Sequence, residues 1–134
     1  MEKLLTQKQA IIISIILLVM VLIFHVLVLT ETIPYTIVWA GKIRSIEEMR
    51  RFEIISICVN SFMILIFLLR ANYVQNRKLT KILNGVIWLL VVIFSLNTVG
   101  NLFAKSKFEL YFFTPLTFIL AILCLRIVMD KKLK

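Results

Sequence analysis

Four runs of apolar residues make up most of the chain, and they constrain its fold more than any other feature. Each run is close to the roughly 20 residues that a helix needs to cross the hydrocarbon core of a bilayer. We predict spans at about residues 11–30, 46–70, 82–103 and 107–129. Backbone groups in lipid must be hydrogen-bonded within the protein, so these runs are expected to be helices. The predicted fold is an all-α membrane protein, a four-transmembrane-helix bundle that forms a single integral membrane domain over residues 1–134.

Composition and charge favour the same class of protein. Of the 134 residues, 61% are hydrophobic and only 17% are charged, which is unlike an ordinary soluble domain. The net charge of +9 comes from basic residues at the ends of the apolar runs, so membrane lipids are expected partners and nucleic acid is not. Cys58 and Cys124 stand alone, with no paired-cysteine motif and no metal-ligand spacing. We therefore expect no metal site and no cofactor.

The distribution of Lys and Arg predicts how the chain is oriented. Ten of these residues lie before the first run, between the second and third runs, or from Arg126 onward, whereas six lie in the other two flanks. By the positive-inside rule, both termini are expected on the cytoplasmic side. The first run is too long for a signal peptide and no small-residue cleavage site follows it, so it is expected to be retained. We predict a multi-pass protein of a cell membrane. A composition rich in isoleucine and lysine suits a low-GC bacterium, so a bacterial inner membrane is the expected location.

Two short motifs predict where helices start. Ser45 is followed three residues later by Glu48, and Ser106 by Glu109, as in a capping box in which each residue bonds the backbone N–H of the other. Helices are therefore expected to begin just after Ser45 and Ser106. Pro115 lies inside the last predicted helix, where it cannot donate to the carbonyl of Tyr111, and a kink is expected there.

Polar residues of the predicted spans fall at one common depth. With a rise of about 1.5 Å per residue, these groups all lie in the outer part of the bundle, whereas the inner half is almost entirely apolar. We expect them to line one polar cavity that opens to the outer side above a closed base. The candidate ligand-binding residues are His25, Glu53, Asn60, Asn97, Asn101, Glu109 and Thr114.

Most of these residues also have a structural interpretation. The asparagines can join helices by interhelical hydrogen bonds, and Gly100 beside them can allow close helix packing. Glu109 has its capping-box role, and Glu53 is expected near the headgroup level. His25 is harder to explain in this way, because an ionisable residue inside a span is by default a functional-site candidate.

Three segments resemble those of small bacterial four-helix membrane proteins, and the resemblance implies no activity. They are IPYTIVWAG at 33–41, EMRRFE at 48–53 and NTVGNLFAK at 97–105. The chain departs from the small multidrug transporters, because these depend on a carboxylate in the middle of their first span and this span offers only His25 near one end. The cavity is similar in kind to that of the sterol-isomerase and sigma-2-receptor-like group, but no motif of that group can be matched residue by residue.

Three functions remain open. The first is a binding or accessory subunit that recognises a lipid, a small amphiphile or a partner helix through the cavity. The second is a subunit of a homodimeric transporter, since four helices leave little space for a conduit within one chain. The third is an enzyme acting on a lipid-like substrate, with His25 as acid or base and Glu53 or Glu109 as its carboxylate. The enzyme ranks last and we assign no catalytic residue, because no nucleophile–base pair is visible at a specific spacing.

Overall fold

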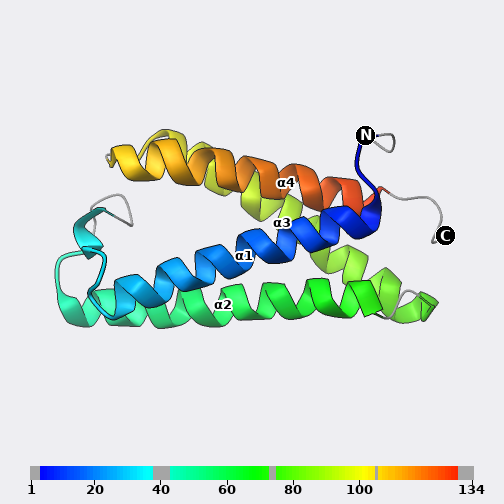
Figure 1. The fold of residues 1–134 in the computed structure, drawn as a ribbon, viewed down its shortest axis with the longest axis horizontal. Coiled ribbons are helices and arrows are strands. Elements are labelled where there is room, and N and C mark those ends of the chain that lie inside the picture. The colour runs from blue at the N-terminus through cyan, green and yellow to red at the C-terminus, as the bar shows by residue number, and fades with distance from the viewer. Residues whose placement is uncertain (1–3, 38–42, 73–74, 105, 130–134) are drawn as a thin grey trace.

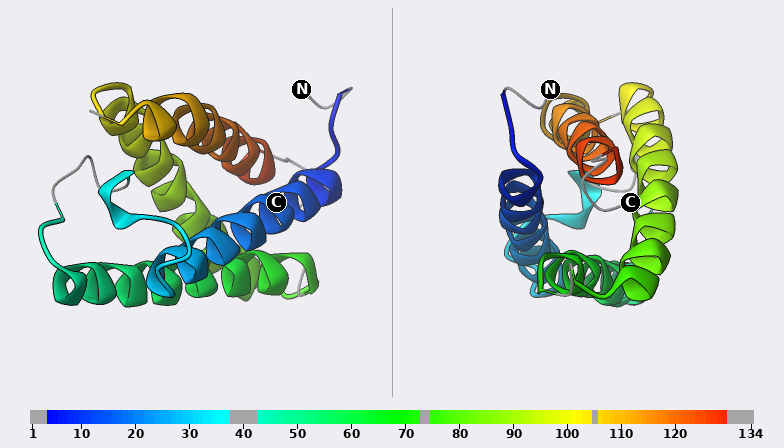
Figure 2. Two further views of the ribbon diagram at one scale, coloured as in Figure 1. Left: turned by 60° about the vertical axis from the view of Figure 1, so that its left-hand side comes forward. Right: turned by 90° about the vertical axis from the view of Figure 1, so that its right-hand side faces the viewer.

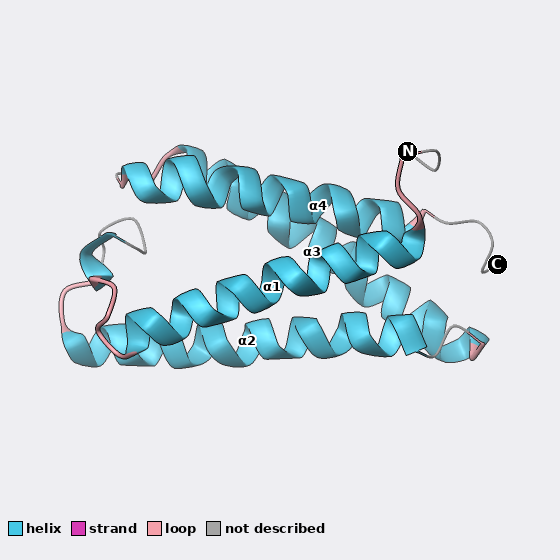
Figure 3. Cartoon of the chain, in the orientation of Figure 1, coloured by secondary structure: helices cyan, strands magenta, loops and turns pink. Residues whose placement is uncertain are grey.

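The computed structural model describes residues 4–37, 43–72, 75–104 and 106–129, and these form helices joined by short loops, with no strand among them (Figure 3). The main helices are α1 (Gln7–Leu29), α2 (Ile46–Asn72), α3 (Arg77–Leu102) and α4 (Thr114–Val128). A short 3-10 turn, η1 (Tyr35–Ile37), follows α1, and a π-helical segment, η3 (Glu109–Phe113), leads directly into α4. Four helices, the last counted as Glu109–Val128, are long and apolar enough to cross a membrane. The all-helical prediction with four such helices is confirmed at this level.

α1 and α3 start before the predicted apolar spans because their N-caps lie in the polar flanks. α1 starts at Gln7, where the Thr6 hydroxyl accepts from the Gln9 amide and the Gln9 side chain accepts from the Thr6 amide. α3 starts at Arg77, because the Asn76 side chain accepts from the amide of Leu79 at 3.1 Å. Hydropathy therefore located the apolar part of each helix, whereas cap chemistry determines where the helix begins.

The two predicted helix starts are in the predicted places, but the capping differs in detail. The Ser45 hydroxyl accepts from the Glu48 amide at 3.1 Å, as expected, and α2 begins at the next residue. The Glu48 carboxylate accepts from the amide of Arg44 instead of Ser45. Ser106 directly precedes the helical residues and its carbonyl accepts from the amide of Leu110, without a side-chain capping bond among the described residues.

The end of α1 turns the chain sharply. The amide of Thr32 donates to the carbonyl of Leu27, and the amide of Glu31 donates to that of Val28, which is the Schellman pattern of a helix C-terminus. Glu31 has φ 64°, a left-handed conformation in which glycine is the usual residue. A left-handed conformation costs a non-glycine residue about 1–2 kcal/mol. At Glu31 this conformation directs the chain into η1.

The helices pair as two hairpins, α1 with α2 and α3 with α4, which diverge along the bundle (Figures 1 and 2). One end of the bundle contains the start of α1, the end of α2, the start of α3 and the end of α4. We call it the closed end. There α1 lies beside α4, and α2 meets α3. At the opposite end, the wide end, α1 lies along α2 and α3 along α4, so the two hairpins are farthest apart. The main apolar core includes Ala10, Phe67, Ile87, Leu120 and Ile127.

The closed end also buries charged side chains, which corrects the expectation of an almost wholly apolar inner half. Arg70 is 1% exposed and its Nε donates to Oδ1 of Asn84 at 2.8 Å. Arg126 is 6% exposed and its Nε donates to the carbonyl of Leu5 at 2.8 Å. From the sequence, both arginines were expected only as flanking charges at the ends of the spans.

Candidate functional site

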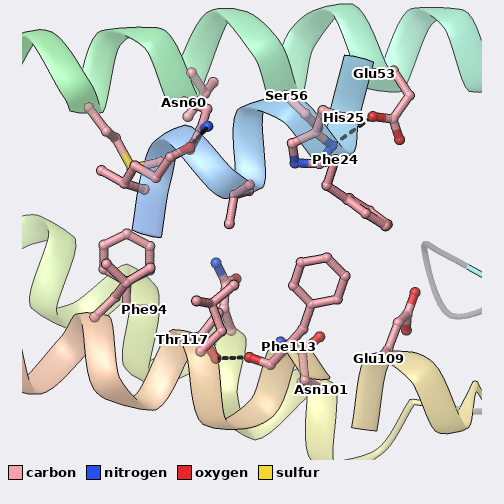
Figure 4. Close-up of a pocket in the computed structure, with 18 of the residues that line it drawn as sticks. Phe24, His25, Glu53, Ser56, Asn60, Phe94, Asn101, Glu109, Phe113 and Thr117 are labelled. Carbon is pink, nitrogen blue, oxygen red and sulfur yellow. Dashed lines mark hydrogen bonds and ion pairs between the residues drawn. The ribbon is translucent and has the colours of Figure 1, made fainter. Parts of the chain in front are cut away.

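A cavity of about 560 Å³ lies between the two hairpins and extends from the wide end into the middle of the bundle. Its walls come from α1, α2, α3, η3 and α4 (Figure 4). The volume is in the range of small-molecule sites, which are commonly 300–1,000 Å³. Six of the seven candidate residues line it: His25, Glu53, Asn60, Asn97, Asn101 and Glu109.

His25 and Glu53 form a close pair at one end of the cavity. Nδ1 of His25 lies 2.6 Å from Oε2 of Glu53, which joins α1 to α2. The Glu53 side chain is fully buried and the His25 side chain is 17% exposed. A carboxylate that contacts one ring nitrogen orients the imidazole and selects its tautomer, so the other nitrogen is available to a ligand in a defined direction. Figure 4 shows the pair facing the space between the hairpins.

Asn60 has the structural role that was considered for the asparagines, although it also lines the cavity. Its Nδ2 donates to the carbonyl of Leu18 at 2.8 Å, so the side chain links α2 to α1. The residue is 2% exposed. Its position in Figure 4, well away from Glu53, marks the deeper part of the cavity.

On α3, the cavity is lined by two carboxamides and a glycine. Asn97 is exposed and Asn101 is partly exposed, and both amides can donate and accept hydrogen bonds. Gly100 does not allow close helix packing here, because a Cβ at this position would meet no atom within 4 Å. It lines the cavity instead, which corrects the structural interpretation of this residue.

The start of the last span differs most from prediction. Pro115 has no N–H to offer to Tyr111, and the chain forms the π segment just before it, with the Thr114 amide donating to the carbonyl of Glu109. Glu109 lines the cavity and is only 6% exposed. Thr114 does not line it, and Thr117 lines it instead. The prediction assumed an unbroken α-helix, whereas the wider π turn changes the face on which the following residues lie.

Aromatic rings connect the two hairpins at the wide end. Phe24 on α1 stacks on Phe108 with ring centroids 5.4 Å apart and meets Phe113 edge-on at 5.1 Å. Phe24 also contacts the ring of His25 at 5.8 Å. Sequence analysis missed Phe24, Phe113 and the rest of the apolar lining, because an apolar residue in a membrane span carries no signal that separates a cavity wall from a lipid-facing surface.

Among the described residues, the cavity combines the His25–Glu53 pair and several carboxamides with a largely apolar wall. Among them, no group of three His, Cys, Asp or Glu side chains could hold a metal ion. The chain matches no protein-family model, no curated protein and no solved structure. Its function must therefore be argued from the site.

Proposed function

We propose that this chain is a multi-pass membrane protein that binds an amphiphilic molecule, a lipid or a small amphiphile, in the cavity between its two hairpins. The observation that carries the proposal is the His25–Glu53 pair at one end of a cavity whose walls are otherwise largely apolar. A molecule with a polar head and an apolar body matches this division. Asn97 and Asn101 add hydrogen-bonding groups near the same end, while Leu18, Phe94 and Leu120 supply apolar surface.

A binding or accessory role is favoured over the other two functions. Transport would depend on a second copy, because within one chain the closed end is filled by apolar core side chains such as Leu83 and Ile127. An enzyme would need a reacting group beside the His25–Glu53 pair. Among the described lining residues the only hydroxyls are those of Ser56 and Thr117. Thr117 bonds Thr98 and the carbonyl of Phe113, so Ser56, beside His25 in Figure 4, is the one hydroxyl left for such a reaction. The partners of the proposed protein are membrane lipids, with a second copy or another membrane protein as a further possibility.

The proposal includes an orientation in which both termini are cytoplasmic and the wide end faces outward, in a bacterial inner membrane. Its support is the excess of Lys and Arg at the closed end. Alkaline phosphatase fused after Ser45 should be active, and the same enzyme fused after Gln75 should be inactive. The reverse pattern would invert the orientation.

Amphiphile binding is tested by native mass spectrometry of the protein released from nanodiscs of phosphatidylethanolamine and phosphatidylglycerol. The wild type should retain lipid. Asn97→Leu should retain about fivefold less, since one lost hydrogen bond to a polar head costs on the order of 1 kcal/mol. Asn72→Leu is the matched control, because Asn72 is an exposed asparagine near the end of α2 that bonds only its own helix, at Leu68. Equal retention by the two variants would count against the cavity as the binding site.

A further inference from the structure

Several residues that line the cavity are also exposed on the side of the bundle. Ile55 and Val59 on α2 are 53% and 52% exposed, and both line the cavity. Asn97 and Gly100 on α3 are likewise exposed and line it. A residue that borders a cavity and also reaches the surface marks an opening, so the cavity opens between α2 and α3.

The course of α3 explains this opening. In Figure 1, α3 begins beside the end of α2 at the closed end and crosses the bundle to lie along α4 at the wide end, and Figure 2 shows the same course. α3 therefore separates from α2 in the half of the bundle that contains the cavity. The corresponding separation of α1 from α4 is bridged by the contacts of Phe24 with Phe108 and Phe113. The two side gaps of the wide end thus differ, and only the α1–α4 gap has aromatic rings across it among the described residues.

Packed apolar side chains surround Phe24, which lines the cavity at the wide end. Phe24, Val28, Ile43 and Met49 form a second buried cluster there. Ile33 and Tyr35, from the segment between α1 and α2, pack against this cluster. An apolar chain that reaches the cavity through the α2–α3 gap would meet Ile55 and Val59 and would not need to pass this cluster.

We infer that the ligand is a lipid of the surrounding bilayer, which reaches the cavity sideways through the gap between α2 and α3. This inference rests on the proposed function and names the source and class of its ligand. Side chains exposed along a transmembrane helix contact acyl chains, so a lipid tail at Ile55 and Val59 never leaves apolar surroundings. The polar head then lies toward His25 and Glu53. The lipid passes Gly100, where the missing side chain leaves space, and its tail extends toward Phe94.

The test places a single tryptophan in the cavity and asks whether lipid tails reach it. Phe94 is 4% exposed and lines the cavity, so Phe94→Trp in a Trp39→Phe, Trp88→Phe background gives a reporter that the surface of the bundle should hide. The full chain is placed in phosphatidylcholine vesicles with brominated acyl chains, because bromine quenches tryptophan on contact. Trp88 alone, which is 47% exposed, is the lipid-facing reference, and Phe67→Trp, at a fully buried core position outside the cavity, is the protected reference.

We expect the fluorescence loss at Phe94→Trp to approach that of Trp88 and to exceed that of Phe67→Trp. Leu116→Trp, at a cavity-lining position on α4, is a second reporter should Phe94→Trp not fold. Quenching of the cavity reporters at the level of Phe67→Trp would overturn the inference, since it would show that no tail enters.

The path is tested by filling the gap. Gly100→Leu places a side chain in the opening, and Gly85→Leu is a matched control on the same helix, because a Cβ at Gly85 also meets nothing within 4 Å and Gly85 does not line the cavity. Gly100→Leu should lower the quenching of Phe94→Trp severalfold, and Gly85→Leu should leave it unchanged. Equal quenching in both would overturn access between α2 and α3. If brominated lipid does not quench the cavity reporters, while the wild type still retains lipid and Asn97→Leu loses it, amphiphile binding stands. Access through the gap between α2 and α3 is then wrong.

Discussion

At the closed end, polar side chains bond across the two hairpins, whereas at the wide end they bond within each hairpin. Arg70 joins α2 to α3 through Asn84, and the Gln7 side chain donates to the carbonyl of Ile127, which joins α1 to α4. At the wide end, His25–Glu53 joins α1 to α2 and Thr98–Thr117 joins α3 to α4. Hydrogen bonds across the hairpins hold the closed end together, and hydrogen bonds within them leave a space at the wide end.

The comparison explains how a chain so rich in apolar residues can contain a cavity. Between helices in lipid there is little hydrophobic driving force, so packing and interhelical hydrogen bonds decide which helices associate. At the wide end, the described contacts across the hairpins are mainly ring contacts of Phe24, and rings bridge a gap without filling it. The described polar pairs there, His25 with Glu53 and Thr98 with Thr117, lie within the hairpins and do not connect them. The position of the cavity thus follows from which helices these bonds connect.

The largest effect is expected from removing one member of the His25–Glu53 pair. His25→Phe leaves a fully buried carboxylate without its imidazole, and breaking a buried pair in this way costs roughly 3 kcal/mol. The free energy of unfolding, measured by titration with a denaturing detergent, should fall by that amount. Ile23→Phe, at a position of α1 that is 55% exposed, is the control and should have almost no effect.

The same experiment has a second variant that separates charge from packing. Adding Glu53→Gln to His25→Phe removes the buried charge, so part of the lost stability should return. If the double variant is less stable than His25→Phe alone, the His25–Glu53 contact is not what links α1 to α2, and the comparison between the two ends would need another basis.

The sequence predicted the general fold because the signal for a membrane helix is long and strong. Each apolar run is visible without any knowledge of its neighbours, and the resulting helices include the predicted spans almost completely. Helix starts at Ser45 and Ser106 were also predictable, since a cap depends on residues three positions apart. The four-residue extension of α1 had its own signal in Thr6 and Gln9, which form a capping box of the same kind.

The candidate site was predictable only in part, for a physical reason. Helical rise gives the depth of a residue, so residues of common depth such as His25, Glu53 and Asn101 were expected near one another, and all three line the cavity. Rise does not give the helical face after an irregular turn, and the π segment before Pro115 places Thr117 on the cavity wall instead of Thr114. Depth also gives no information on how hairpins are tilted, so the gap between α2 and α3 had no signal in the sequence.

A smaller effect is expected at the closed end, from Arg70→Met. Methionine keeps much of the apolar stem and removes the charged head, so no buried charge is left behind, in contrast to His25→Phe. What is lost is the bond from Arg70 to Asn84 and the other contacts of the guanidinium, for a net cost of about 1–2 kcal/mol. Arg77→Met, at the exposed start of α3, is the matched control and should change the stability little.

The location of the effect decides whether the closed end holds the two hairpins together. Because Arg70 bonds across the hairpins, Arg70→Met should speed hydrogen exchange at the end of α2 and the start of α3 together, and Arg77→Met should not. The same variant should also increase the quenching of Phe94→Trp by brominated lipid, since hairpins that are less firmly held at one end open more readily at the other. Arg70→Met could instead lower the stability while leaving hydrogen exchange in α3 and the quenching of Phe94→Trp unchanged. The two ends would then be independent, and Arg70 would stabilise only α2.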